Sequence, residues 1–170
     1  MRKLILMRHA KAEGRSASGE DFDRALTERG WADSQLMGRV LKDAGLKPDL
    51  ALVSAAQRTR DTWAGVSEAF GEVEARFEKG LYASSPRVLR QAIARVEDEA
   101  DTVMLVGHNP ETALLMLELL VEGAEPASVL DRARSKFPTA ATVVFDFDEA
   151  MRPRFYNLYF AKDYGGGAGD

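Results

Sequence analysis

The sequence predicts an α/β domain built on a largely parallel β-sheet. Three apolar runs, at residues 3–7, 50–54 and 102–106, are continuous rather than alternating, as is typical of strands covered on both faces. Segments with helical apolar spacing separate these runs, and such alternation favours a parallel sheet. Two later segments, residues 142–147 and 154–160, predict strands joined by a short polar turn, which indicates an antiparallel hairpin at the sheet edge.

The first half of the chain supplies clear helix boundaries. The stretch 11–24 is rich in Gly, Ser and Asp and predicts a loop. Thr27 then has the features of an N-cap, because apolar residues recur at helical spacing up to Ala44 and Gly45 supplies a stop. The segment 57–70 predicts a second helix after the strand at 50–54.

The middle of the chain repeats one type of helix start. A weakly alternating strand is expected at residues 73–77, and Ser85 followed by Pro86 predicts an N-cap and first helical residue. Asn109 and Pro110 predict the same arrangement after the strand at 102–106. Two tryptophans, Trp31 and Trp63, are expected in the core.

The length of 170 residues fits one compact domain, which we place at residues 1–163. The segment 164–170 has almost no side chains to bury and predicts a flexible, glycine-rich tail. The N-terminus lacks the long apolar region of a signal peptide, and no stretch is long enough to cross a membrane. We therefore expect a cytoplasmic protein without a membrane partner.

Composition and missing motifs exclude several functions. The net charge of -4 gives no broad basic surface for nucleic acid, and the lack of cysteine excludes disulfides and thiolate chemistry. Neither a nucleotide-binding P-loop nor a Gly-x-Gly-x-x-Gly turn is present, and no histidine pair has metal-ligand spacing. Asp146 and Asp148 alternate with phenylalanines, which favours an exposed strand face over a metal site.

Chemically active side chains follow each of the three buried strands. Ligands of open α/β sheets bind at the carboxyl ends of the strands, so these side chains should share one crevice. The chain has two histidines, and both occur immediately after an apolar strand. The residues in question are Arg8 and His9 after the first strand, Ser54 and Arg58 after the second, and Gly107, His108 and Asn109 after the third.

Two histidines and two arginines around one point predict a phosphoryl site. Arginine presents a rigid fork of donors that matches phosphate oxygens, and an imidazole nitrogen can attack phosphorus. A protonated His108 and the helix N-terminus at Pro110 would add positive charge. Taken singly, each residue has an ordinary explanation: a rim histidine, a solvated Arg58, or a turn-forming Ser54. The joint pattern at three strand ends favours the phosphoryl site.

These residues resemble the histidine phosphatase superfamily. The resemblance lies in Arg8-His9, in the Ser-x-x-x-Arg-x-x-x-Thr stretch from Ser54 to Thr62, and in Gly107-His108. Small size and the segments 8–12, 23–30 and 107–110 are similar to its SixA-type branch of bacterial phosphohistidine phosphatases. In order and spacing, the resemblance covers roughly residues 1–160.

The resemblance implies a three-layer α/β/α, phosphoglycerate mutase-like fold with a mostly parallel central sheet. It also implies a mechanism without metal or cofactor. His9 would form a phosphohistidine intermediate that water hydrolyses, while Arg8, Arg58 and His108 bind the phosphoryl oxygens. Ser54 and Asn109 are further candidate substrate contacts.

One departure from the family bears on the substrate. Many relatives carry an acidic proton donor where this chain has Gly80 or Leu81, so Glu78 and Asp23 are the candidates here, with Asp21 as a further alternative. An imidazole leaving group needs less acid help than an alkoxide. We therefore expect a phosphorylated phosphorelay or phosphotransfer protein as partner. The alternatives are a phosphatase of small phosphorylated metabolites and a non-catalytic domain that binds phosphate or phosphoproteins.

Overall fold

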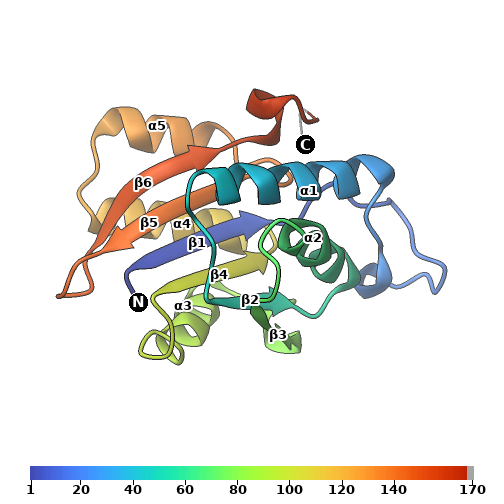
Figure 1. The fold of residues 1–170 in the computed structure, drawn as a ribbon, viewed down its shortest axis with the longest axis horizontal. Helices are drawn as coiled ribbons and strands as arrows, with labels where there is room; N and C mark the ends of the chain where they lie inside the picture. The colour runs from blue at the N-terminus through green and yellow to red at the C-terminus, as the bar shows by residue number, and fades with distance from the viewer. Residues whose placement is uncertain (168–170) are drawn as a thin grey trace.

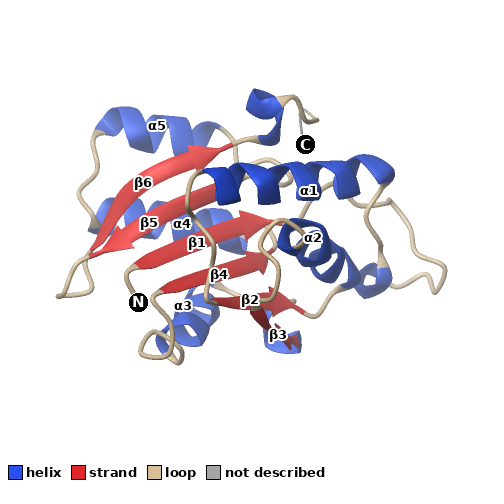
Figure 2. Ribbon diagram, in the orientation of Figure 1, coloured by secondary structure: helices blue, strands red, loops and turns tan. Residues whose placement is uncertain are grey.

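The computed structural model describes residues 1–167. Its strands form one six-stranded sheet in the order β3-β2-β4-β1-β5-β6 (Figures 1 and 2). Strands β1 to β4 run parallel, while β5 is antiparallel to β1 and to β6, so the predicted mixed sheet with a C-terminal hairpin is confirmed. The bounds are β1 Lys3–Arg8, β2 Leu50–Ser54, β3 Glu74–Glu78, β4 Thr102–Gly107, β5 Thr142–Phe147 and β6 Pro153–Tyr159.

Helices cover both faces of the sheet and produce the expected three layers (Figure 1). One face carries α1 and α2, and the other carries α3, α4 and α5. The helices are α1 Glu28–Asp43, α2 Gln57–Ser67, α3 Pro86–Ala94, α4 Glu111–Glu122 and α5 Ala127–Ser135, with short 3-10 turns at η1 Asp21–Asp23, η2 Lys79–Leu81 and η3 Ala161–Tyr164.

The two-sided core explains the continuous apolar runs. In β1, Leu4 and Leu6 pack among side chains of α3, α4 and α5, whereas Ile5 and Met7 pack among those of α1 and α2. All four are at most 1% exposed. Because successive strand residues point to opposite faces, a strand between two helical layers needs apolar residues at every position.

Two of the three predicted caps are confirmed. Thr27 accepts a hydrogen bond from Gly30 N at 3.0 Å, and Ser85 accepts one from Val88 N at 3.2 Å. The predicted cap at Asn109 is wrong: α4 begins at Glu111 without a side-chain cap. The Asn109 amide instead donates to the carbonyl oxygen of Phe137 at 2.8 Å, because a tertiary partner lies within its reach.

Other differences from the sequence-based expectations are local. Helix α5 was not predicted, and α2 ends at Ser67 rather than at residue 70. Trp63 is buried as expected, while Trp31 is half-buried against the same core. No helix among residues 1–167 is long and apolar enough to cross a membrane.

The predicted tail divides into two parts. Backbone hydrogen bonds join Gly166 to Ala161 O at 2.9 Å and Gly167 to the Asp33 carboxylate at 3.0 Å. Residues 168–170, to which the prediction of flexibility also applies, lie outside the described residues.

Candidate active site

Two adjacent parallel strands bring the histidines together. Arg8 at the end of β1 is paired with Gly107 at the end of β4, and His9 N donates to Gly107 O at 3.0 Å. The residues that follow, His9 and His108, therefore emerge side by side, with ring centroids 5.5 Å apart. They are 8% and 7% exposed. The predicted convergence of strand ends thus holds for both imidazoles.

His9 is held as a neutral ring in one tautomer. Its Nδ1 lies 2.7 Å from the carbonyl oxygen of Ala10; a carbonyl only accepts, so Nδ1 carries the proton and Nε2 keeps its lone pair. Burial, with smaller contributions from His108, Arg58 and Arg8, lowers the pKa of His9 to about 3. At neutral pH the ring is therefore uncharged and can act as a nucleophile.

His108 is positioned by a buried serine. Its Nε2 lies 2.7 Å from Ser54 Oγ, and Ser54 is fully buried at the end of β2. Burial and the charge of Arg58 lower the pKa of His108 to about 4. The ring is therefore neutral before any anion binds. Its Nδ1 is buried and has no hydrogen-bond partner among residues 1–167.

Arg58 enters the site from the first turn of α2 and is 6% exposed. Its Nη1 donates to the main-chain oxygen of Asp21 at 2.8 Å, and Nη2 donates to the Asp21 carboxylate at 3.1 Å. Arg8 donates weakly from Nη1 to Phe137 O at 3.4 Å. Burial and the charge of Arg58 lower the pKa of Arg8. The structure thus gathers the two predicted arginines and both histidines.

Two further side chains complete the wall of the site. The hydroxyl of Tyr82, just after η2, donates to the Asp21 carboxylate at 2.6 Å. The Tyr82 ring meets His108 edge-on, with centroids 5.6 Å apart, and contacts Phe22 on its other side at 4.9 Å. Asp21 was only an alternative in the sequence analysis, and Tyr82 was missed. The short turn η2 separates Tyr82 from the end of β3, so its sequence position gave no direct signal.

The candidate proton donors occupy different places. The Asp23 carboxylate is exposed and accepts from Ser18 Oγ at 2.6 Å, while Glu78 is half-buried at the end of β3, opposite Ser54 in the register. Asp21 is the carboxylate that contacts Arg58. Hydrogen bonds from Tyr82 and the arginines hold the pKa of Asp21 well below its usual range. Asp21 is therefore ionised at neutral pH and has no proton to give.

Loops on both sides tie the site to the sheet. Thr62 Oγ1 accepts from Ala10 N at 3.0 Å, which joins the end of β1 to α2. On the other side, Ala140 N donates to His9 O at 3.0 Å. The Asn109 side-chain amide donates a hydrogen bond to Phe137 O, whereas its Oδ1 is buried with no partner among residues 1–167. Asn109 thus fixes the segment that flanks Arg8.

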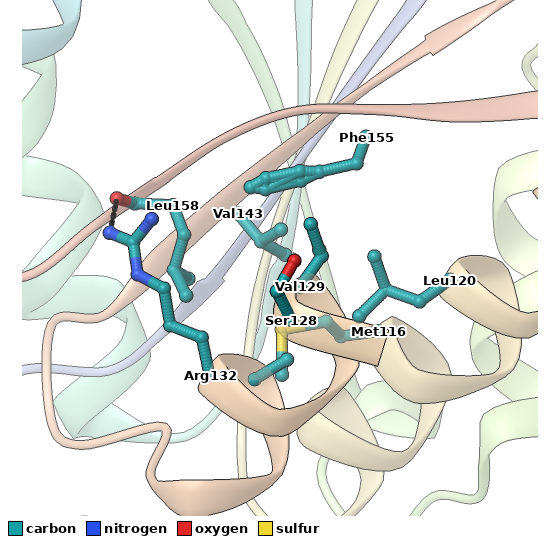
Figure 3. Close-up of a pocket in the computed structure, with 9 residues that line it drawn as sticks. Met116, Leu120, Ser128, Val129, Arg132, Val143, Phe155 and Leu158 are labelled. Carbon is teal, nitrogen blue, oxygen red and sulfur yellow. Dashed lines mark hydrogen bonds between the residues drawn. The ribbon is translucent and has the colours of Figure 1, made fainter. Parts of the chain in front are cut away.

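Two hollows differ in chemical character. A polar hollow of about 430 Å³ borders Asp21 and is lined by Gly14, Arg15, Ser16, Gly19, Glu20, Asp21 and Arg24. A hollow of about 220 Å³ lies between α4, α5 and the β5–β6 hairpin (Figure 3). Its walls, including Met116, Phe155 and Leu158, are mostly apolar and hold neither histidine. Its one arginine, Arg132, donates to the carbonyl oxygen of Leu158 at 3.2 Å, whereas the strand ends gather two arginines and two histidines and are therefore the candidate site.

A metal is not suggested by the side chains that the structure describes. Residues 1–167 contain no group of three or more His, Asp or Glu side chains placed to hold a metal ion. The positive charge at the candidate site comes from Arg8 and Arg58.

Comparison with known proteins identifies the family. The profile described as "Histidine phosphatase superfamily (branch 1)" matches residues 4–83, a span that contains Arg8, His9 and Arg58. An uncharacterised protein of Mycobacterium tuberculosis is 34% identical over 138 residues, which is 81% of this chain and 85% of that protein. The chain belongs to the histidine phosphatase superfamily.

Solved structures of this superfamily match nearly the whole chain. A protein of Agrobacterium tumefaciens, described as a candidate phosphohistidine phosphatase SixA, is 30% identical with a TM-score of 0.82. The match covers 94% of this chain and 97% of that one. A protein of Nakamurella with the same description is 26% identical, with a TM-score of 0.81 over 94% and 95% of the two chains. The expected phosphoglycerate mutase-like architecture of histidine phosphatases is therefore present.

Proposed function

We propose that this chain is a metal-independent phosphatase that removes phosphoryl groups from protein phosphohistidine through a covalent intermediate on His9. The observation that carries the proposal is the neutral His9 ring, whose Nδ1 is engaged by Ala10 O at 2.7 Å beside Arg8, Arg58 and His108. This arrangement supplies a nucleophile and fixed positive charge at one point. Phosphoryl transfer depends chiefly on a positioned nucleophile and on positive charge that stabilises the transition state.

The first step transfers the phosphoryl group to the enzyme. His9 Nε2 attacks phosphorus, and the bond between phosphorus and the substrate imidazole breaks. The electron pair of that bond goes to the imidazole nitrogen, which takes a proton from solvent. Arg8 and Arg58 hold the phosphoryl oxygens as charge develops. Water then attacks the phosphorus on His9, which releases inorganic phosphate and restores the neutral ring.

His108 contributes a hydrogen bond rather than a permanent charge. Ser54 Oγ lies 3.4 Å from Ala56 N, so the oxygen can accept there weakly and donate its own proton to His108 Nε2. The neutral ring then carries a proton on Nδ1, directed to a phosphoryl oxygen. An arriving phosphoryl dianion raises the pKa of His108 and favours the charged form. We therefore propose that Ser54 positions His108, and that Asn109 holds the Phe137 segment beside Arg8.

Two features favour phosphohistidine over phosphate esters. Asp21, the carboxylate at the site, is ionised and cannot protonate an alkoxide. The polar hollow beside the site is lined largely by exposed residues of the segment 14–21, which suits a phosphoryl group presented by a protein. The description of the 30% identical Agrobacterium protein as a candidate SixA agrees with this substrate class.

The test compares substrates with chelator present throughout. Phosphate release from a histidine-phosphorylated phosphotransfer domain should exceed release from glycerol 3-phosphate, an ester with an alkoxide leaving group, in kcat/KM by on the order of 10²–10⁴-fold, the usual worth of the missing general acid. His9→Ala should abolish turnover yet still bind inorganic phosphate. Mass spectrometry at alkaline pH should detect phosphorylated His9 in the wild type.

Each alternative has its own outcome. Faster ester turnover would indicate a phosphatase of small phosphate monoesters, and loss with chelator would exclude the metal-independent mechanism. Phosphate binding without turnover on any substrate would indicate a non-catalytic binding domain. Glu78→Gln and Asp23→Asn test the remaining proton donors: a loss confined to the ester would identify the donor.

A further inference from the structure

Contacts from several parts of the chain converge on Asp21. Its carboxylate and main-chain oxygen accept from both terminal nitrogens of Arg58 in α2. The Tyr82 hydroxyl donates to the same carboxylate at 2.6 Å, and Arg24 Nε donates to its other oxygen at 2.9 Å. The Asp21 side chain is 54% exposed, and η1 contains no buried residue. Core packing therefore does not explain this set of contacts.

The contacts use only part of the Arg58 guanidinium. A guanidinium carries five N–H groups in one rigid plane, and Asp21 takes one from each terminal nitrogen. Three N–H groups remain, including that of Nε, which is buried without a partner among residues 1–167. A carboxylate that fixes the end of the fork prevents it from rotating and leaves its other donors for a phosphoryl oxygen.

The same carboxylate fixes a second group beside the histidines. By holding the Tyr82 hydroxyl, Asp21 fixes a ring whose edge contacts His108, with centroids 5.6 Å apart. The Arg58 guanidinium lies 5.8 Å from that ring. Asp21 therefore determines the positions of two groups that border His108.

We propose that Asp21 is a positioning residue of the phosphoryl site, which fixes Arg58 and Tyr82 so that the remaining N–H groups of Arg58 meet the phosphoryl group. The inference rests on the proposed function for its reaction, whereas the contacts that support it are independent of that function. Asp21 acts through Arg58 and does not touch the reacting atoms.

The kinetic test compares Asp21→Asn with Glu28→Gln, an exposed carboxylate in the first turn of α1. With a histidine-phosphorylated protein as substrate, Asp21→Asn should lower kcat by on the order of 10–100-fold, because a misplaced group costs this much. The Kd for inorganic phosphate should change much less. Glu28→Gln should stay within about twofold of the wild type, and Asp21→Glu should recover part of the loss.

A spectroscopic readout separates positioning from a merely structural role. The chain has only two histidines, so NMR can titrate each ring. Removing the negative charge of Asp21 should lower the pKa of His108, while Glu28→Gln should leave it unchanged. The charged and titratable groups around His108 are Asp21, which favours its charged form, and Arg58, Arg24, Arg8, His9 and Tyr82.

Two results would overturn the inference. One is an Asp21→Asn enzyme with wild-type kcat and an unmoved His108 titration. The other is a variant that binds phosphate more tightly at unchanged kcat, which would make Asp21 a competitor of the substrate for Arg58. If the wild type turned over no phosphorylated substrate, the proposed function would fail. Positioning would then be judged by the His108 titration, and by whether Asp21→Asn alters phosphate binding.

Discussion

At the scale of single residues, the site depends on which nitrogen of each imidazole is occupied. In His9, Nδ1 is hydrogen-bonded to a carbonyl oxygen, which leaves Nε2 for the proposed attack. In His108, Nε2 is hydrogen-bonded to Ser54, which leaves Nδ1. The two rings thus use different nitrogens for their protein contacts. These two contacts support our proposal that His9 attacks phosphorus and that His108 binds the phosphoryl group.

Ser54→Ala tests the assignment of Ser54 to His108. The loss of the 2.7 Å contact leaves the His108 ring free to rotate, so kcat for phosphohistidine hydrolysis should fall by about tenfold. A buried polar atom left without a partner should also lower the free energy of unfolding by about 1–3 kcal/mol. Steady-state kinetics and urea unfolding measure the two effects.

The matched control is Ser34→Ala, another fully buried serine, whose hydroxyl bonds within α1. It should leave kcat unchanged. If Ser54→Ala retained wild-type kcat, Ser54 would have no role in orienting His108.

Residues that follow a strand directly were predictable from the sequence, and residues supplied by loops were not. Strand ends fix the positions of Arg8, His9 and His108, because the backbone leaves the sheet there. Tyr82 reaches the site only because η2 turns the chain back after β3. That turn depends on tertiary packing, which a single sequence does not reveal.

At the scale of elements, α2 must lie close to α1 to deliver Arg58. Glycine allows this approach: a Cβ on Gly38 of α1 would lie 2.3 Å from the carbonyl oxygen of Val66 in α2. Gly38→Ala should therefore push the helices apart and lower the free energy of unfolding by about 1–3 kcal/mol. Activity should fall as well, since α2 carries Arg58.

Gly80→Ala is the control for this prediction, because a Cβ at Gly80 would meet no atom within 4 Å. Thermal unfolding of both variants measures the difference. Equal stability of Gly38→Ala and Gly80→Ala would show that α1 and α2 can separate without cost.

Elements with strong periodic or capping signals were predictable, while α5 was not. Its apolar residues Val129, Leu130 and Ala133 cover less than two turns, and only Ala133 is buried. Other α5 residues, Ser128 and Arg132, line the hollow that α5 shares with α4 and the β5–β6 hairpin (Figure 3). A helix that buries so little leaves a correspondingly weak pattern in the sequence.

At the scale of the whole molecule, the fold places its most costly buried groups at one edge. Both histidines and Arg58 are less than 10% exposed, and they follow β1, β4 and β2, whose interior residues are apolar. Nearby arginine charges and burial work together to keep both imidazoles neutral. The protein therefore loses stability when these rings are forced to take up protons.

This cost predicts how stability changes with pH. An unfolded histidine takes up its proton near pH 6.5, whereas the folded protein holds the pKa of His9 to about 3 and that of His108 to about 4. Below pH 6.5 the unfolded state binds more protons, so the contribution to stability is complete above that pH and is lost as pH falls towards 4. The loss should be on the order of a few kcal/mol, measured by urea unfolding across this range.

Between pH 6.5 and 4, the change in stability reports on the histidines and not on Asp21. The depressed pKa of Asp21 affects stability only below about pH 4. His108→Gln keeps a polar side chain without a titrating ring and should reduce the slope between pH 6.5 and 4. Inorganic phosphate should oppose the loss at low pH, because a bound anion raises both imidazole pKa values and stabilises the folded state. If the free energy of unfolding of His108→Gln changed with pH as steeply as that of the wild type, burial would not keep His108 neutral. The proposed role of His108 as a neutral donor before phosphate binds would then be wrong.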